Sequence, residues 1–389
     1  VARNGTVESI SHPGRARDLQ YAQSGVFLSA HCHILLAIWD GKTSGQLGGT
    51  AQVVRFHHHD IMPGYTSRTV AAQQMLIDDE SDLIYHIVCS REGPDGAPAE
   101  GFEPLDCWWF TNDRNAPRQR DLPEQHQLIF SRSAEFSHDG ITHRDRIPSE
   151  SYPLMSDEDA ENLPRGLGMI NHGFCISDWL AIHYQKLTLR VLRVTHLLAF
   201  LMGFMFILFS DLRSHQIYMV AFLLFFAISA GVQKYAKRQG WHRKYLDYRT
   251  LAEGMRVQFY LSAAGIVTDN ESKFTHDNFL QTQDPELGWI RNVMRVAGTR
   301  CDADREVSDE GLHFALREWV GDNDSGQLGY YRRKADQWIK RNRNTERLSL
   351  LSLLTSVAVI LLILFGGAVF GDAIVDPLFV LMGSMLLAY

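Results

Sequence analysis

Two apolar runs decide the fold of this chain, VTHLLAFLMGFMFILFS (residues 194–210) and IYMVAFLLFFAISAGV (residues 217–232). They contain 17 and 16 residues and no charged side chain. This is close to the shortest helix that crosses about 30 Å of hydrocarbon at about 1.5 Å per residue. A buried hairpin of a soluble protein usually keeps a polar stripe, and neither run offers one. The sequence therefore predicts a transmembrane hairpin over residues 194–232.

Positive charges flank this hairpin at its outer ends. Lys186, Arg190 and Arg193 precede the first run, and five Lys or Arg follow the second between residues 234 and 244. The connecting turn, 211–216, holds one arginine beside an aspartate. Because Lys and Arg collect on the cytoplasmic side of spans, we expect both flanks in the cytoplasm. The predicted location is the inner (cytoplasmic) membrane, with several passes.

A second apolar pair closes the chain. Residues 348–370 are followed by the turn GDAIVDP (371–377) and by residues 378–389, and seven Lys or Arg precede the pair between residues 332 and 347. This pattern predicts a second hairpin over residues 348–389 that also enters from the cytoplasm. The chain starts at Val1 without an initiator Met and stops inside an apolar run. We therefore expect a fragment at both ends.

Charge and cysteine content narrow the class of protein. The formal net charge of -7 argues against a general nucleic-acid binder. The cysteines are odd in number, scattered and without CxxC spacing, which favours free thiols in a reducing cytoplasm. They are Cys32, Cys89, Cys107, Cys175 and Cys301.

A strand, a glycine-rich loop and a helix follow one another near the N-terminus. ILLAIW (34–39) is typical of a strand buried on both faces, and the helix is expected to open at about Thr50. Glycines let a backbone approach a ligand, and the free N–H groups of a helix start favour anions, so a nucleotide phosphate would fit. A tight structural turn is the alternative. The candidate ligand-binding residues are Asp40, Gly41, Lys42, Gly45, Gly48, Gly49 and Thr50.

Two of these candidates have equally ordinary roles. Asp40 could bind a ribose hydroxyl or cap the turn, and Lys42 could contact a phosphate or remain solvated.

Three nearby histidines, His57 to His59, raise the question of a metal site. Adjacent histidines on a helix point in different directions, and the i, i+4 spacing of zinc motifs is absent, so no metal is expected.

The rest of the chain is assigned from composition and periodicity. Residues 93–165 are rich in Pro, Gly, Asp and Ser and are expected to be irregular with short strands. Residues 178–193 show helical spacing and run directly into the first span. Residues 244–266 are expected to form a helix with Glu253 and Arg256 paired at i, i+3.

The segments LLAIWDGKTSGQLGGTAQVV (35–54), DLIYHIVCSRE (82–92) and GPDGAPAEG (93–101) resemble the SLOG superfamily. This resemblance implies a Rossmann-like fold of the kind found in nucleotide sensors and LOG phosphoribohydrolases. LOG enzymes carry a GGxGTxxE pattern with a catalytic Glu, and Val53 stands at that position here. Since Val cannot do acid–base chemistry, the resemblance implies a binding domain, with a membrane-tethered nucleotide hydrolase as the alternative.

The segments YRTLAEGMRVQFY (248–260) and EWVGDNDSGQLGYYRRKADQW (318–338) resemble SLATT domains, membrane effectors proposed to accompany SLOG sensors in bacterial defence. Two departures are a long insert, 269–309, and the second hairpin. The resemblances imply a sensor and effector that perturbs the membrane on binding a ligand. A transporter or scaffold is a further alternative.

The whole chain is thus expected to join an α/β Rossmann-like cytoplasmic domain to an all-α membrane region of two hairpins with a cytoplasmic helical insert. No cofactor or catalytic residue is expected. The expected partners are a nucleotide second messenger or NAD-like ligand, the lipid bilayer and further copies in a homo-oligomer, without nucleic acid. The expected segments are 1–165 (ligand-binding domain), 166–193 (connector helix), 194–232 (first hairpin), 233–347 (cytoplasmic helical region) and 348–389 (second hairpin).

Overall fold

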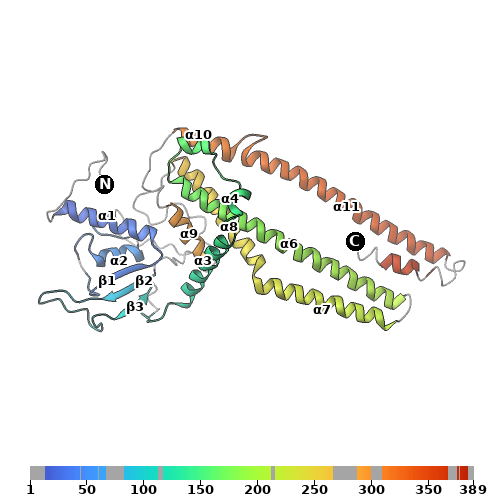
Figure 1. The fold of residues 1–389 in the computed structure, drawn as a ribbon, viewed down its shortest axis with the longest axis horizontal. Coiled ribbons are helices and arrows are strands. Elements are labelled where there is room, and N and C mark those ends of the chain that lie inside the picture. Colours follow the sequence, from blue (N-terminus) through green and yellow to red (C-terminus); the bar gives the residue numbers. More distant parts are fainter. Residues whose placement is uncertain are drawn as a thin grey trace. The chain divides into compact units, whose positions relative to one another are not determined.

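A computed structural model describes residues 14–43, 45–59, 61–66, 83–112, 117–211, 215–265, 287–298, 309–366, 375 and 377–383. This part of the chain is mostly helical (Figure 1). It falls into two compact units, each built from two stretches of sequence. Unit 1 takes in residues 1–179 and 250–315, and unit 2 takes in residues 180–249 and 316–389.

A three-stranded sheet lies in unit 1. β1 (Leu35–Trp39) pairs in parallel with β2 (Ile84–Val88), and β2 pairs antiparallel with β3 (Cys107–Phe110). The register places Trp39 opposite Val88, so the carboxyl ends of β1 and β2 meet at one edge. The predicted strand over residues 34–39 is confirmed as β1, but the expectation that both of its faces are buried is wrong, because only one face is covered in the part of the chain that the structure describes. The sheet is smaller than that of a doubly wound domain, and one of its two pairings is antiparallel.

α2 (Thr50–His59) packs on β1, and α1 (Arg15–His31) packs on α2. The predicted start of a helix at Thr50 is confirmed. Every second side chain of β1 points inward, so Ala37 and Trp39 are buried, whereas Leu36 and Ile38 on the other face are each 65% exposed. The inward residues pack in two clusters, Ala22, Val26, Phe56 and Met62 between the helices and Ala37, Trp39, Val54 and Ile84 against the sheet.

The expectation of irregular chain and short strands over residues 93–165 is confirmed for the strand β3, but it missed three helices. This stretch contains α3 (Glu124–Thr142), α4 (Ile147–Glu150) and α5 (Asp157–Asn162) beside β3. α3 is polar along most of its length, but it packs on α9 (Gly288–Gly298), where the rings of Phe136 and Trp289 lie 5.5 Å apart. Tertiary packing thus stabilises a helix that composition did not favour.

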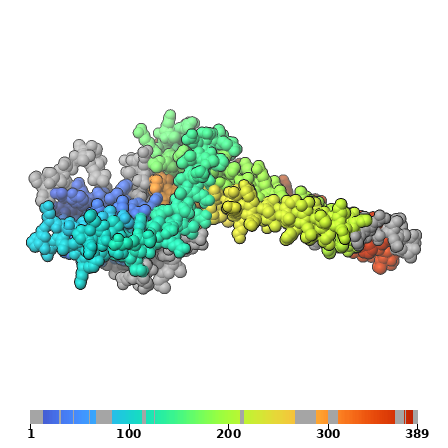
Figure 2. All heavy atoms as spheres, turned by 60° about the horizontal axis from the view of Figure 1, so that its bottom comes forward, coloured from blue at the N-terminus to red at the C-terminus, as the bar shows by residue number. Residues whose placement is uncertain are grey.

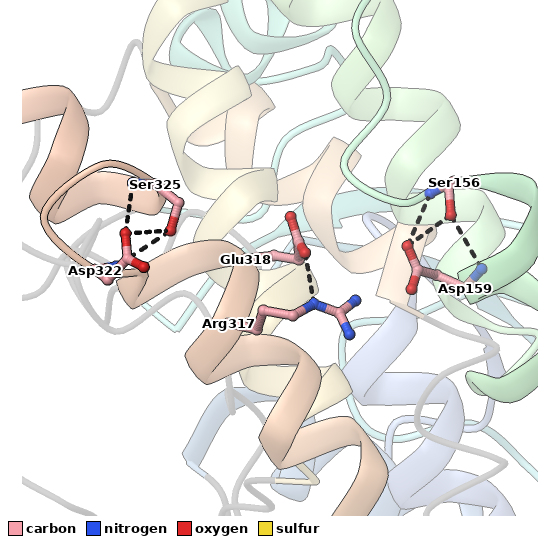
Figure 3. Close-up of polar contacts among 6 residues, drawn as sticks. All are labelled: Ser156, Asp159, Arg317, Glu318, Asp322 and Ser325. Carbon is pink, nitrogen blue, oxygen red and sulfur yellow. Dashed lines mark hydrogen bonds and ion pairs between the residues drawn. The ribbon is translucent and has the colours of Figure 1, made fainter.

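Capping side chains lie before α5 and before the long helix that begins at Gly326 (Figure 3). At the start of α5, the N–H of Asp159 donates to Oγ of Ser156, and the Asp159 carboxylate accepts the N–H of Ser156 in return. In unit 2, Oδ1 of Asp322 accepts the N–H groups of Asp324 and Ser325, which turns the chain before the next helix. Such caps satisfy backbone donors that helix ends leave unpaired.

Long helices dominate the rest of the described chain. α6 (Leu167–Asp211) and α7 (Gln216–Gln239) form the predicted first hairpin, and Gly240, with φ 65°, ends α7 before α8 (Trp241–Ala263). The predicted pair of Glu253 and Arg256 is present at 2.8 Å in α8. The elements after α9 are α10 (Asp309–Ala315), the π-helix η3 (Leu316–Val320) and α11 (Gly326–Gly366).

Among the residues that the structure describes, three segments are long and apolar enough to cross a membrane: 167–210 in α6, 216–263 from α7 into α8, and 326–365 in α11. Their apolar side chains are exposed, as in Phe206 (55%) and Phe365 (79%), and Figure 2 shows α7 (yellow) uncovered along the visible face. A soluble protein rarely exposes so much continuous apolar surface, so the buried-hairpin alternative fails and the chain has the features of a membrane protein. The turn of the second predicted hairpin lies largely outside the described residues.

Candidate functional site

Asp40 stands directly after β1 and organises the candidate site. Its carboxylate is buried, and Oδ1 accepts the backbone N–H of Lys42 at 3.1 Å. The carbonyl of Lys42 in turn accepts Nε1–H of Trp39 at 2.9 Å. Gly41, between them, has φ 81°, which side-chain-bearing residues rarely adopt. The local sequence therefore forms a tight turn that presents Lys42 at the end of the sheet.

Arg91, after β2, joins this turn from the neighbouring strand. Its Nε lies 3.0 Å from Oδ2 of Asp40, while its side chain remains 55% exposed. The loop that it begins is closed by its own backbone, because the N–H of Arg91 donates to the carbonyl of Gly96 at 2.7 Å. The carbonyl of Asp40 accepts the N–H of Ala99, which pins the same loop across the end of β1.

A pocket of about 450 Å³ lies at this edge of the sheet. Lys42 crosses it to donate from Nζ to the carbonyl of Asp95 at 2.8 Å. The side chains that line the pocket carry both signs of charge. The pocket therefore suits a polar ligand with a localised negative group better than an apolar ligand. The lining residues are Asp40, Lys42, Thr43, Arg91, Glu92, Gly93, Pro94, Asp95 and Gly96.

The glycine-rich loop lies apart from this pocket. The N–H of Gly48 donates to Oε1 of Gln52 at 3.3 Å, and the N–H of Gly49 donates to the carbonyl of Gln46 at 3.1 Å. Gln52 also donates to the carbonyl of Gly45, so one buried amide holds the loop closed. Gly48 sits against α1, where a Cβ would lie 2.6 Å from the backbone nitrogen of Ala22.

The structure thus separates the seven predicted residues. Asp40 and Lys42 line the pocket and Gly41 lies between them in the chain, whereas the residues from Gly45 to Thr50 do not line it. Sequence reasoning missed Arg91 and its loop. A usable signal was present, since the carboxyl ends of parallel neighbouring strands meet at one edge.

Val53 faces away from the pocket. It packs beside α1, and a Cβ on Gly25 would lie 2.5 Å from its Cγ2. Among the residues that the structure describes, no group of three or more His, Cys, Asp or Glu could hold a metal ion. What the pocket offers chemically is therefore ionic and hydrogen-bonding contact from the two cations and the carboxylates around them.

Comparison with known proteins found no matching family model, and no curated protein or solved structure matches the chain.

Proposed function

We propose that this protein is a membrane-bound sensor and effector. Its pocket at the end of the sheet binds a phosphorylated, nucleotide-derived ligand on the cytoplasmic side of a bacterial inner membrane. Ligand binding then perturbs the membrane as part of defence signalling. The fold proposed for the binding part is a Rossmann-like domain, and the working assembly is a homo-oligomer.

The observation that carries the proposal is the ion pair of Arg91 with Asp40. The pair uses Nε of Arg91, and no partner is recorded for the two terminal nitrogens within the described chain. A guanidinium held in this way can donate two parallel hydrogen bonds from its terminal nitrogens to a phosphate. Lys42 lies in the same pocket and can add a second positive charge.

The location of the pocket supports the same interpretation. In open α/β sheets, ligands bind outside the carboxyl ends of parallel strands, and here β1 and β2 end together. Asp40 retains lone pairs beyond its two recorded hydrogen bonds, so it could also accept a ribose hydroxyl. A nucleotide combines a phosphate with such a ribose hydroxyl.

Helices that belong to both units support the effector half of the proposal. α6 and α8 each contribute residues to unit 1 and to unit 2 without a break in the helix. A ligand can shift a structure only through its different affinities for two states. Because the helices are continuous, a structural change in unit 1 can be transmitted along them to the apolar spans.

Calorimetric titration of the full chain in detergent tests the binding. AMP, ATP, NAD and a cyclic dinucleotide serve as probes, and Arg91→Ala is compared with Arg120→Ala. Arg120 forms a matched 3.0 Å ion pair with Asp106 but does not line the pocket. We expect at least one probe to bind, with roughly tenfold or greater weakening by Arg91→Ala and little change by Arg120→Ala. Absence of binding by all probes, or equal effects of the two variants, would contradict the proposal.

A further inference from the structure

The first half of α11 presents a dense positive surface. Every residue from Tyr330 to Leu348 is exposed. This segment contains seven Lys or Arg against two carboxylates, Asp336 and Glu346. The cations are Arg332, Arg333, Lys334, Lys340, Arg341, Arg343 and Arg347.

These cations are not neutralised by neighbouring carboxylates. Glu346 accepts the side-chain amide of Asn342 at 2.6 Å, Arg333 donates to the carbonyl of Asp324, and Lys334 lies over the ring of Tyr330. Within the described residues, no ion pair joins any of the seven to an Asp or Glu. The surface therefore retains its charge for an external partner.

Four of the seven lie beside the predicted span. Lys340, Arg341, Arg343 and Arg347, here called the basic cluster, stand within eight residues of Leu348, where the apolar run begins. Eight residues of helix measure about 12 Å, so the backbone of the cluster lies at most that far from Leu348, whatever the tilt. The headgroup layer and the Debye length at physiological salt are each roughly 5–8 Å. Arg343 and Arg347, at most five residues from Leu348, lie within about 8 Å of it along the helix. At 3.6 residues per turn the four cover roughly half of the helix circumference.

We propose that the basic cluster binds the headgroups of anionic phospholipids. Three of its four residues are Arg, whose planar fork matches a phosphate bidentately. On the N-terminal side of the cluster, Trp338 and Ile339 are 66% and 64% exposed, and Trp is enriched at membrane interfaces. Charge complementarity and direct continuity with the span favour a lipid surface over an acidic protein. The inference does not depend on what the pocket in unit 1 binds.

The test measures lipid binding by the full chain in detergent. Native mass spectrometry follows titration with phosphatidylglycerol and with phosphatidylcholine of the same acyl chains. The cluster variant is Arg341→Gln/Arg343→Gln/Arg347→Gln. Its matched control, Arg332→Gln/Arg333→Gln/Lys334→Gln, removes the same charge from the same helix, at least about 20 Å from Leu348.

We expect the wild type to prefer phosphatidylglycerol. The cluster variant should bind it roughly tenfold or more weakly with phosphatidylcholine unchanged, and the control should keep the preference. Absence of any preference in the wild type, or equal losses in the two variants, overturns the proposal. Should the cluster variant fail to fold, the wild type titrated at low and high salt decides instead. A headgroup preference must weaken as salt screens the charges, and a salt-independent preference overturns the proposal.

Discussion

Nη1 of Arg118 lies 2.6 Å from Nδ1 of His86, inside the covered face of the sheet. His86 is fully buried, and its Nε2 donates to the carbonyl of Trp39 at 2.9 Å, so Nδ1 is the acceptor of the Arg118 proton. The guanidinium also lies 4.0 Å from the ring centre of Phe110. Burial lowers the pKa of His86 and the pKa of Arg118, and the positive charge of Arg118 lowers that of His86 further. The neutral imidazole and the cation therefore stabilise the sheet together.

Arg118→Met should loosen the sheet. Met keeps contact with the rings but leaves Nδ1 of His86 buried without a donor, at a cost of about 1–3 kcal/mol. Hydrogen exchange of the β1 and β2 amides should accelerate as a result. Arg120→Met, two residues away and exposed, is the control. Equal exchange in the Arg118 and Arg120 variants would argue against this role.

Two glycines of the same loop should respond differently to alanine. Gly48 has φ 74°, and its Cβ would meet the backbone of α1, whereas nothing lies within 4 Å of a Cβ on Gly45. We expect Gly48→Ala to destabilise the α1–α2 packing by roughly 2 kcal/mol or more and Gly45→Ala to change little. Urea unfolding monitored by exchange in α1 measures the difference. Similar stabilities for both variants would contradict the close approach of the loop to α1.

His33 should make unit 1 sensitive to acid. Burial lowers the pKa of His33 to about 4, the charge of Arg295 acts in the same direction, and a hydrogen bond with Asn292 opposes both. Between pH 6.5 and 4 the unfolded chain therefore binds more protons at this site, so stability is complete above pH 6.5 and falls as the pH falls towards 4. The site should contribute a loss of about 2 kcal/mol between pH 7.5 and pH 5. His33→Gln should reduce that pH dependence in thermal unfolding, and an unchanged slope would refute the assignment.

Flexible residues in α6 should separate binding from its membrane effect. The helix is unbroken from Leu167 to Asp211, so a Gly-Ser segment inserted after Gln185 interrupts it well before the span. Nucleotide affinity should remain within about twofold, because the pocket is remote in sequence. Ligand-dependent dye release from proteoliposomes should disappear. Release that persists in the insertion variant would favour an effect exerted through clustering or enzymatic activity.

The orientation of the hairpins is open to direct labelling. Cysteines placed at Ser214 and Ala373, both outside the described residues, should react with a membrane-impermeant maleimide from the cell exterior. The reason is that Lys and Arg gather at the opposite ends of the spans. Cysteine at Lys237 should react only after the cells are opened. Protection of either turn would overturn the predicted topology of that hairpin.

The features predicted best from sequence are those with strong local signals. The uncharged runs that end at Ser210 and begin at Ile217 place the two helix ends at the turn of the first hairpin within one residue. ILLAIW and the following glycines likewise predict β1 and the start of α2. Each signal depends on hydrophobicity or turn chemistry within a few residues, which a single sequence displays directly.

Features that depend on distant contacts were not predicted. α3 draws its stability from packing on α9, which lies more than a hundred residues further along the chain. Arg91 pairs with Asp40 only because β1 and β2 are neighbours in the sheet. The order of strands in a sheet cannot be predicted from the sequence of either strand alone. The contact of the glycine loop with α1 through Gly48 is likewise a tertiary feature.

The outward side chains of β1 have a practical consequence for anyone who isolates unit 1. β1 ends the strand order of the described sheet, and Leu36 and Ile38 each leave 65% of their surface exposed. An apolar edge strand of this kind templates pairing with other chains, so an excised soluble piece would tend to aggregate even when correctly folded. Lysine at position 36 or 38 should keep such a piece monodisperse at higher concentration, because an edge charge opposes stacking of strands.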